Sequence, residues 1–552
     1  MTRDCACALS RSPCKLHADN NMSTPRQTLP RHLPLRLPRI CVAIAGPNPG
    51  DMVEKAESLS RENPFLEFRL DYLSSPALAL PGLKKFLEYH SHVLAIATCR
   101  RAANGGKFRG SVQTEVDMLL KAVSAGCQIV DLSLESAAKV KTGDIEKLRS
   151  KAGLILSYHD FRGTKNLDKI FERMQQYPAD FIKVVSTATC LYDNVLMMKF
   201  LEHTSDKRSM VGVCMGEQGI ISRVLGVRAG SQFIFAAASS GEETAPGQIA
   251  SRTLREVYRI EQVDNATRVY GVAGDPVSHS LSPLLMNTAF RREAINAVYL
   301  SLHAKTIKDL IACARDIPLH GISVTMPYKE EIIKHLDNTD PVTAKIGACN
   351  TVIRSQDGKL YGFNTDVFGV LRPLEARIAI KDSNILVLGA GGAARAAVFG
   401  LRERGANVWV MNRTASAGQR LAKQAKAKYL GKSQLKPLMK KLQFQVVINA
   451  TSVGMEDPGM PAKISKETPM SDAELKLTGA RYLMEMVYAP AETKLMKIAR
   501  GLAMEIISGA EMFVHQGARQ FEIWTGKPAP VDDMHRVVVT ALANRAAAAA
   551  KK

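Results

Sequence analysis

The chain has 552 residues, of which 46% are hydrophobic, and a formal net charge of +21. This length exceeds what one hydrophobic core usually holds and predicts roughly three or four domain-sized units. No run of about 18 uncharged apolar residues occurs, which argues against a membrane span. The ten cysteines form no CxxC pair, as in reduced cytosolic proteins. No recognition motif accompanies the basic charge, so we expect anionic small molecules rather than nucleic acid as partners.

Residues 1–38 are rich in Pro and Arg, poor in acids and without hydrophobic periodicity, so we expect them to be disordered. Two interpretations of this segment stay open. It has the composition of a plastid transit peptide, or the chain starts too early and Met22 or a nearby residue is the true beginning. We therefore expect a cytoplasmic protein, with a plastid location as the alternative.

Eight short apolar runs follow, with helix-like segments between most of them. They span residues 40–45, 65–73, 93–99, 128–134, 153–160, 180–187, 209–216 and 232–239. Strands that alternate with helices predict parallel βα units. Eight such units in about 200 residues favour a closed (β/α)8 barrel, with an open doubly wound sheet as the structural alternative.

Polar residues of this half lie near the ends of the predicted strands. Lys183 stands inside the run 180–187, His159 ends the fifth run, and Arg100 follows the third. In a (β/α)8 barrel the active site forms at the carboxyl ends of the strands. A lysine in such a dry site can be neutral and nucleophilic toward a carbonyl group. The structural alternatives are a lysine that extends to solvent and a plain ion pair between Glu67 and Arg69.

The second half begins near residue 268. The stretch "RVYGVAGDPVSHSLSP" predicts a strand, a loop and a helix that starts near Ser282 and Pro283, because Pro suits the first helical turn. "NILVLGAGGAARAAVFGLRERGANVWVMNRT" then predicts a strand, a Gly-rich turn, a helix and a second strand. This order is typical of a dinucleotide-binding unit, in which the glycines let the backbone approach a pyrophosphate.

The residues after the second of these strands indicate which dinucleotide binds. The strand ends without the acidic residue that usually binds the ribose hydroxyls of NAD, and an arginine with a neighbouring hydroxyl suits a 2′-phosphate. We therefore expect NADP(H). The predicted cofactor-binding residues are Gly389, Ala390, Gly391, Gly392, Ala393, Asn412, Arg413 and Thr414.

On these residues the first half resembles type I 3-dehydroquinate dehydratase, a barrel enzyme that works through a lysine Schiff base, and the second half resembles shikimate dehydrogenase. Together they resemble the fused dehydratase–dehydrogenase family of the shikimate pathway. The resemblance implies an α/β chain with an N-terminal (β/α)8 barrel followed by a two-lobed dehydrogenase with a Rossmann-type NADP lobe. The expected units are a barrel at 39–262, a substrate lobe at 266–378, an NADP lobe at 379–508, and C-terminal helices at 509–552 that return to the substrate lobe.

The resemblance also assigns roles in the barrel. Lys183 in "FIKVV" matches the Schiff-base lysine, and His159 in "LSYHDF" matches the general acid/base. Further residues match positions that bind 3-dehydroquinate, namely Glu67, Arg69, Arg100, Arg223, Thr244 and Gln248. One departure is Asn104, which stands where the family commonly has a Glu that orients the histidine. An amide can bond an imidazole but cannot stabilise an imidazolium by charge.

In the second half, Lys329 and Asp366 match the acid/base pair that reduces 3-dehydroshikimate to shikimate. The matching substrate contacts are Ser280, Ser282, Thr325, Asn350, Tyr488 and Gln516. Glu485 departs from the family, which usually has Asp there. Taken singly, Ser280, Ser282 and Asp366 could be helix caps. No His, Cys and carboxylate cluster has metal spacing, so we expect no metal.

Two other functions stay open at this point. One is a regulatory binding protein, which resembles these domains without their catalytic residues; the retained lysines argue against it. The other is a quinate dehydrogenase in the second half, which the paired serines and Arg413 disfavour. The oligomeric state does not follow from these patterns.

Overall fold

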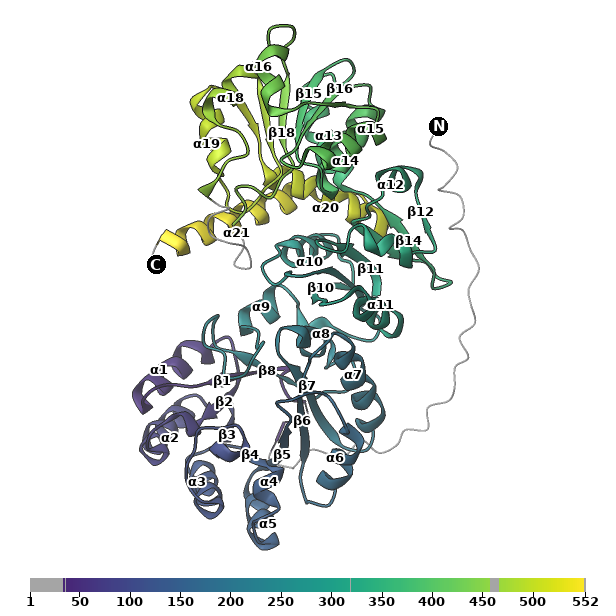
Figure 1. The fold of residues 1–552 in the computed structure, drawn as a ribbon. Helices are drawn as coiled ribbons and strands as arrows, with labels where there is room; N and C mark the ends of the chain where they lie inside the picture. The colour runs from purple at the N-terminus through teal and green to yellow at the C-terminus, as the bar shows by residue number, and fades with distance from the viewer. Residues whose placement is uncertain (1–32, 35, 318, 457–465, 551–552) are drawn as a thin grey trace.

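The computed structural model describes residues 33–34, 36–317, 319–456 and 466–550. Most of the expected 1–38 segment therefore lies outside the described residues. Figure 1 shows a barrel at one end of the molecule, a mixed sheet in the middle and a parallel sheet at the other end. Among the described residues, no helix has the length and apolar character needed to cross a membrane.

The first sheet has eight parallel strands in the order β7-β6-β5-β4-β3-β2-β1-β8. The first and last strands in sequence, β1 and β8, pair directly, and a bridge between Met210 and Ser231 joins β7 to the segment before β8. The strands are β1 (Ile40–Ile44), β2 (Phe65–Arg69), β3 (Leu94–Thr98), β4 (Ile129–Ser133), β5 (Gly153–His159), β6 (Phe181–Thr187), β7 (Ser209–Met215) and β8 (Ile234–Ala237). The barrel expected from sequence is confirmed.

Helices cover the outside of this barrel (Figure 1). They are α1 (Pro49–Ser60), α2 (Leu80–Tyr89), α3 (Val112–Ser124), α4 (Leu134–Ala137), α5 (Thr142–Lys151), α6 (Leu167–Met174), α7 (Tyr192–Thr204), α8 (Ile220–Leu225) and α9 (Ser251–Glu256). The strands are buried almost throughout, because one face of each strand packs in the barrel interior and the other packs against the helices. This explains their continuous apolar runs. The predicted strand 65–73 ends early: Leu70–Tyr72 is a 3-10 turn, and Asp71 in that turn pairs with Arg69.

The second sheet has the strand order β10-β9-β11-β13-β14-β12. Its strands are β9 (Arg268–Gly274), β10 (Ala297–His303), β11 (Leu319–Val324), β12 (Asn338–Thr339), β13 (Thr351–Arg354) and β14 (Leu360–Phe363). Its helices are α10 (Ser282–Arg292), α11 (Ile307–Asp316), α12 (Pro341–Ile346) and α13 (Asp366–Glu375). Two C-terminal helices, α20 (Gly509–Thr525) and α21 (Val531–Ala550), pack against α10, and α20 also packs against α13.

The third sheet is parallel, with the order β17-β16-β15-β18-β19-β20. Its strands are β15 (Asn384–Leu388), β16 (Asn407–Met411), β17 (Lys428–Tyr429), β18 (Val446–Asn449), β19 (Tyr482–Glu485) and β20 (Glu505–Ile507). Its helices are α14 (Gly392–Glu403), α15 (Ala415–Gln424), α16 (Leu435–Leu438), α18 (Asp472–Leu477) and α19 (Lys494–Gly501). The strand order reverses between β16-β15 and β18, and ligands of such sheets bind at that point.

The barrel and the second sheet contact each other through α7 and α11. The Asp309 carboxylate, in the first turn of α11, accepts hydrogen bonds from the backbone N–H groups of Leu191 and Tyr192 at 2.7 and 3.1 Å. Nearby, the His303 ring lies between two carboxylates, 3.0 Å from Glu217 of the barrel and 2.8 Å from Asp275 of its own half. The connection is therefore polar as well as packed.

Candidate active sites

The barrel interior changes from apolar to polar along the strands. A step of two residues keeps a side chain on the same face of a strand, so apolar Ile129 is followed by Asp131 and then by Ser133. The same step leads from Phe181, at the apolar base, to Lys183. The polar layers lie toward the carboxyl ends of the strands, where a barrel of this fold places its chemistry.

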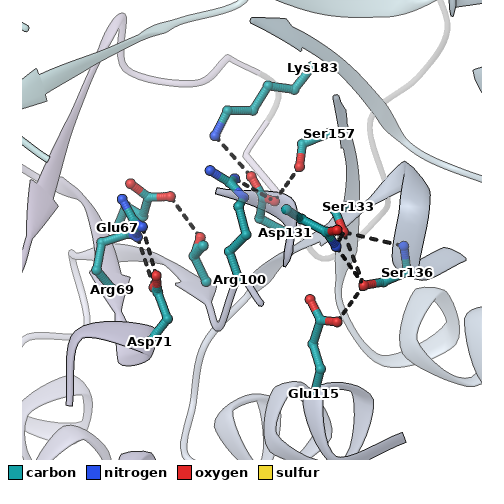
Figure 2. Close-up of polar contacts among 12 residues, drawn as sticks. Glu67, Arg69, Asp71, Arg100, Glu115, Asp131, Ser133, Ser136, Ser157 and Lys183 are labelled. Atoms are coloured by element: carbon teal, nitrogen blue, oxygen red, sulfur yellow. Dashed lines mark hydrogen bonds and ion pairs between the residues drawn. The ribbon is translucent and has the colours of Figure 1, made fainter. Parts of the chain in front are cut away.

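Asp131 on β4 is the centre of the polar layer (Figure 2). Its carboxylate lies 2.9 Å from Nζ of Lys183 and 3.1 Å from the Arg100 guanidinium, and it accepts a hydrogen bond from Ser157 Oγ at 2.7 Å. Burial alone would raise the pKa of Asp131, but the attraction of Lys183 and Arg100 outweighs it and holds this pKa well below its usual value. The carboxylate therefore stays ionised and fixes both cations.

His159 lies at the end of β5, two residues beyond Ser157 and on the same face of the strand. Its ring stacks on that of Phe161, with the centroids 6.2 Å apart. Burial lowers the pKa of His159 well below its ordinary value, and the positive charges of Arg100 and Lys183 lower it further. The imidazole is therefore neutral at physiological pH and able to accept a proton.

Glu67 and Arg69, both on β2, do not pair with each other. Glu67 accepts a hydrogen bond from Thr98 Oγ1 at 2.7 Å, and Arg69 forms a two-point ion pair with Asp71 at 2.9 and 2.8 Å (Figure 2). The structural alternative of a plain Glu67–Arg69 ion pair is thus wrong. Both side chains are buried in the barrel mouth and held by partners outside the pair.

The other barrel residues from the sequence prediction lie near the loop that follows β8. Thr244 donates from its N–H and its hydroxyl to Oε1 of Gln248 at 2.8 and 3.1 Å. Arg223 on α8 donates to the backbone oxygen of Pro246 at 2.8 Å and has no carboxylate partner within the described residues. Burial lowers the pKa of Arg223 to about 10. A buried guanidinium without a counter-charge suits an anionic ligand.

The second site is a cavity of about 1270 Å³ between the second and third sheets. Every predicted substrate and catalytic residue of the second half lines it, namely Ser280, Ser282, Thr325, Lys329, Asn350, Asp366, Tyr488 and Gln516. The predicted cofactor residues Gly389 to Ala393, Asn412 and Arg413 line the same cavity. Thr414 is not among the lining residues; it precedes α15, and its backbone oxygen accepts a hydrogen bond from Asn412.

Lys329 and Asp366 form the polar centre of this cavity. Nζ of Lys329 lies 2.6 Å from one carboxylate oxygen of Asp366, and the Asn350 amide donates to the other oxygen at 2.8 Å. The same Asn350 nitrogen lies 3.4 Å from Oε1 of Gln516. Each carboxylate oxygen thus has its own donor, and the ammonium is directed by a buried acid.

The glycine-rich turn after β15 faces Lys329. Gly389 has a φ of +114°, and a Cβ there would meet the backbone oxygen of Ala450 at 2.9 Å, so only glycine fits the turn. Gly391 caps α14 without a side-chain hydrogen bond. The first N–H groups of that helix are therefore open to an anion. A Cβ on Gly392 would lie 3.6 Å from Cδ of Lys329, so any side chain larger than hydrogen at this position would touch the lysine.

These residues fit a dinucleotide phosphate. The open N-terminus of α14 suits a pyrophosphate. Arg413, just beyond the end of β16, is exposed on the cavity wall and forms no ion pair within the described part of the chain. A 2′-phosphate would supply the missing counter-charge.

Comparison with known proteins separates the same two parts of the chain. The type I 3-dehydroquinase model matches residues 40–265. The model of the shikimate dehydrogenase substrate binding domain matches 272–352, that of shikimate / quinate 5-dehydrogenase matches 374–457, and that of the shikimate 5'-dehydrogenase C-terminal domain matches 509–539. The chloroplastic bifunctional 3-dehydroquinate dehydratase/shikimate dehydrogenase of Arabidopsis thaliana is 32% identical over 89% of this chain and 82% of its own. This chain belongs to the bifunctional 3-dehydroquinate dehydratase/shikimate dehydrogenase family.

Single-function relatives of this family match the second half. The NADP(+)-dependent shikimate dehydrogenase of Pyrococcus furiosus is 38% identical over 51% of this chain and 99% of its own. A crystal structure of shikimate dehydrogenase from Aquifex aeolicus covers 50% of this chain and 99% of its own, with 35% identity and a TM-score of 0.45.

Sequence reasoning missed Asp131, although its signal was present. Asp131 is the one charged residue within the buried strand "IVDLS", as Lys183 is within "FIKVVST". A charge inside an apolar strand needs a partner, and the two strands supply it to each other.

The departure at Glu485 has a structural account. Its carboxylate is buried and accepts hydrogen bonds from Asn449 and Thr493 at 2.8 Å each and from the N–H of Val487 at 3.0 Å. Burial raises the pKa of Glu485 to about 7 against these bonds. Asn449 in turn accepts from Thr451, which lines the cavity. Glu485 therefore supports the loop at the floor of the cofactor pocket.

Proposed function

We propose that the chain catalyses two consecutive reactions of the shikimate pathway. The barrel dehydrates 3-dehydroquinate to 3-dehydroshikimate, and the second half reduces 3-dehydroshikimate to shikimate with NADPH. The observation that carries the proposal is a lysine paired with a buried carboxylate in each half, Lys183 with Asp131 at 2.9 Å and Lys329 with Asp366 at 2.6 Å. Relatives named for both activities support it.

In the barrel, Lys183 is the nucleophile. Once its ammonium has given up a proton to water, the amine attacks the ketone carbon of 3-dehydroquinate, and loss of water leaves a C=N bond. The iminium accepts the electron pair of a neighbouring C–H bond as His159 takes the proton. His159 then returns a proton to the departing hydroxyl, and hydrolysis of the iminium releases product and amine. The neutral state of His159 suits the first of these transfers.

In the barrel we assign the substrate carboxylate to a charged partner and the substrate hydroxyl groups to hydrogen-bonding partners. We assign the substrate carboxylate to Arg223, because this buried cation lacks an acidic partner in the described structure. Arg69 and Arg100 are already paired with Asp71 and Asp131. Hydroxyl groups of the substrate are assigned to Glu67, Arg69, Arg100, Thr244 and Gln248.

In the cavity of the second half, Lys329 donates a proton to the carbonyl oxygen of 3-dehydroshikimate, and Asp366 directs its ammonium. NADPH supplies the hydride when it is bound. Ser280 and Ser282, whose hydroxyls lie 3.1 Å apart, bind the substrate carboxylate. The remaining substrate contacts are assigned to Thr325, Asn350, Tyr488 and Gln516.

The Arg413→Asp variant should discriminate between the cofactors. We expect the KM for NADPH to rise about ten- to a hundredfold, because the 2′-phosphate loses a charge-assisted partner and gains a repulsive one. The KM for NADH should change little. Arg420→Asp on α15 is the matched control, since it makes the same charge change at an exposed residue outside the cavity lining. Equal losses for the two cofactors would contradict the assignment.

One cuvette tests both activities. Protein with 3-dehydroquinate alone should develop the ultraviolet absorbance of the conjugated enone, and added NADPH should then be consumed. If no enone forms but supplied 3-dehydroshikimate still oxidises NADPH, the barrel assignment fails. If a folded protein gives neither signal, the chain is a binding protein of this fold and not an enzyme.

We also propose the domain division 39–262, 266–378, 379–508 and 509–552, which the separate sheets support. For location we propose the cytoplasm, with a plastid as the alternative because the Arabidopsis thaliana relative is named chloroplastic. The cysteines of the described residues are unpaired, as both reducing compartments require. A fluorescent fusion of residues 1–38 that enters plastids would favour the alternative.

A further inference from the structure

Behind the barrel site lies a buried carboxyl group that the proposed steps do not use. Glu115 is on helix α3 and is fully buried, and Figure 2 shows it directed at the residues that follow β4. Its Oε2 accepts a hydrogen bond from Ser136 Oγ at 2.6 Å. Its Oε1 is buried without a hydrogen-bond partner in the described structure. A half-satisfied buried carboxyl is costly and needs an explanation.

The hydrogen bond from Ser136 is the last of a chain. Ser133 Oγ donates to Ser136 Oγ at 3.0 Å, and the Asn104 amide nitrogen donates to Ser133 at 2.6 Å and to Ser136 at 3.1 Å. Every bond in this chain runs toward Glu115. The chain therefore connects a carboxyl group in the helix layer to Asn104, in the turn that follows β3.

This chain comes within one layer of the catalytic histidine. Ser133 pairs in register with Ser157 of the neighbouring strand, and His159 lies two residues beyond Ser157 on the same interior face. On the other side, a Cβ on Gly105, next to Asn104, would clash with the ring of Phe161, and Phe161 stacks on His159. Asn104 therefore lies between Ser133 and Phe161, each of which is near His159.

The direction of the chain decides which atom Asn104 offers to the site. Each serine has one hydroxyl hydrogen, so an ionised Glu115 obliges Ser136 to donate to it, and Ser136 Oγ is left as the acceptor to which Ser133 donates. Both serine oxygens are then acceptors for the Asn104 amide nitrogen. The Asn104 Oδ1 is left as an acceptor. An uncharged donor in place of Glu115 would let the chain reverse and the amide turn over.

We propose that Glu115 is a positioning residue of the dehydratase site, which acts through Ser136 and Ser133 to hold Asn104 with its oxygen available to the imidazole N–H of His159. This inference rests on the proposed dehydratase function. The barrel then needs no carboxylate at position 104. The ionised Glu115 on the adjacent helix fixes the direction of the hydrogen bonds through the two serines, and this direction orients the Asn104 amide.

The test compares Glu115→Gln with Asp117→Asn, which makes the same carboxylate-to-amide change at an exposed residue of α3. We expect Glu115→Gln to lower kcat for dehydration roughly tenfold, the size expected for one hydrogen bond, with KM nearly unchanged. Asp117→Asn should leave both activities unchanged. Reduction of 3-dehydroshikimate by the same samples should be unaffected, which reports that the dehydrogenase half is intact, and an unchanged KM for 3-dehydroquinate reports the same for the barrel.

A pH comparison separates positioning from a purely structural role. Burial raises the pKa of Glu115 to about 7, and the negative charge of Asp131 adds to this rise. The Ser136 hydrogen bond and the positive charges of Arg101 and Arg100 act in the opposite direction. Above this value the wild type has the carboxylate that the variant lacks, and below it neither does. The ratio of wild-type to Glu115→Gln turnover should therefore be roughly tenfold near pH 8.5 and approach one near pH 6.

A ratio that does not change with pH, or a Glu115→Gln variant with wild-type turnover, would overturn the inference while the dehydratase activity itself stands. Loss of enone formation in the wild type would instead overturn the proposed function. If Glu115→Gln does not fold, Ser136→Ala breaks the same chain and should show the same tenfold loss above pH 8; an unchanged turnover there would overturn the inference equally.

Discussion

The Lys183→Ala variant should lose at least about a thousandfold in kcat for dehydration of 3-dehydroquinate and keep NADPH-dependent reduction of 3-dehydroshikimate. The amine that forms the C=N bond is removed, and no other lysine lies among the described partners of Asp131. The two activities are measured in one preparation by enone absorbance and by NADPH oxidation.

A chemical readout accompanies this variant. Borohydride added with 3-dehydroquinate should reduce the imine and attach the substrate permanently to the wild-type chain, as an added mass on the peptide that contains residue 183. The Lys183→Ala chain should show no such mass. Loss of both activities in a folded variant would contradict the existence of two independent sites, and a labelled peptide elsewhere would move the nucleophile to another lysine.

The second large effect is expected at Lys329. Lys329→Met should lower kcat for reduction of 3-dehydroshikimate by about a hundred- to ten-thousandfold, the usual contribution of a general acid, and leave dehydration intact. The ammonium is held 2.6 Å from Asp366 on the wall of the cavity, so its removal affects the reacting oxygen more than the fold.

Lys334→Met is the matched control for this variant, because Lys334 is exposed in the 3-10 turn that follows Lys329. It should keep full activity. Asp366→Asn retains the shape of the acid and its contact with Asn350, and it should also lower kcat by removing the charge that directs the ammonium. A Lys329→Met chain that reduces 3-dehydroshikimate at the wild-type rate would remove Lys329 from the proposed mechanism.

Much of the architecture could be predicted because it depends on local periodicity. Parallel strands buried on both faces appear as continuous apolar runs, and all eight runs of the first half became strands of the barrel. The run 65–73 was predicted too long, since an Arg69–Asp71 ion pair turns the chain where the hydrophobic pattern continues. Apolar pattern alone does not reveal a turn that is fixed by side-chain charge.

The site residues also differ in how far local sequence pattern could predict them. Lys183, Lys329 and Asp366 could be predicted from motifs, because Lys183 stands inside an apolar strand, Lys329 precedes a 3-10 turn and Asp366 begins α13. The charge inside its apolar strand marks Asp131, but its partner Lys183 lies 52 residues away, and Ser136 lies 21 residues from Glu115, so both pairings form only in the folded barrel. Spacing along one strand does not indicate which other strand supplies the counter-charge, and here β5 lies between the two.

Arg223, which has no carboxylate partner among the described residues, has a thermodynamic consequence for the barrel. A guanidinium that is buried without a carboxylate makes the ligand-free state less stable than its packing would allow. A bound carboxylate removes this deficit, and any ligand that binds only the folded state at a hundred times its Kd adds about 2.7 kcal/mol to the free energy of unfolding. The barrel should therefore resist heat and proteolysis best when substrate is abundant, so that flux through the first reaction also protects the domain that performs it.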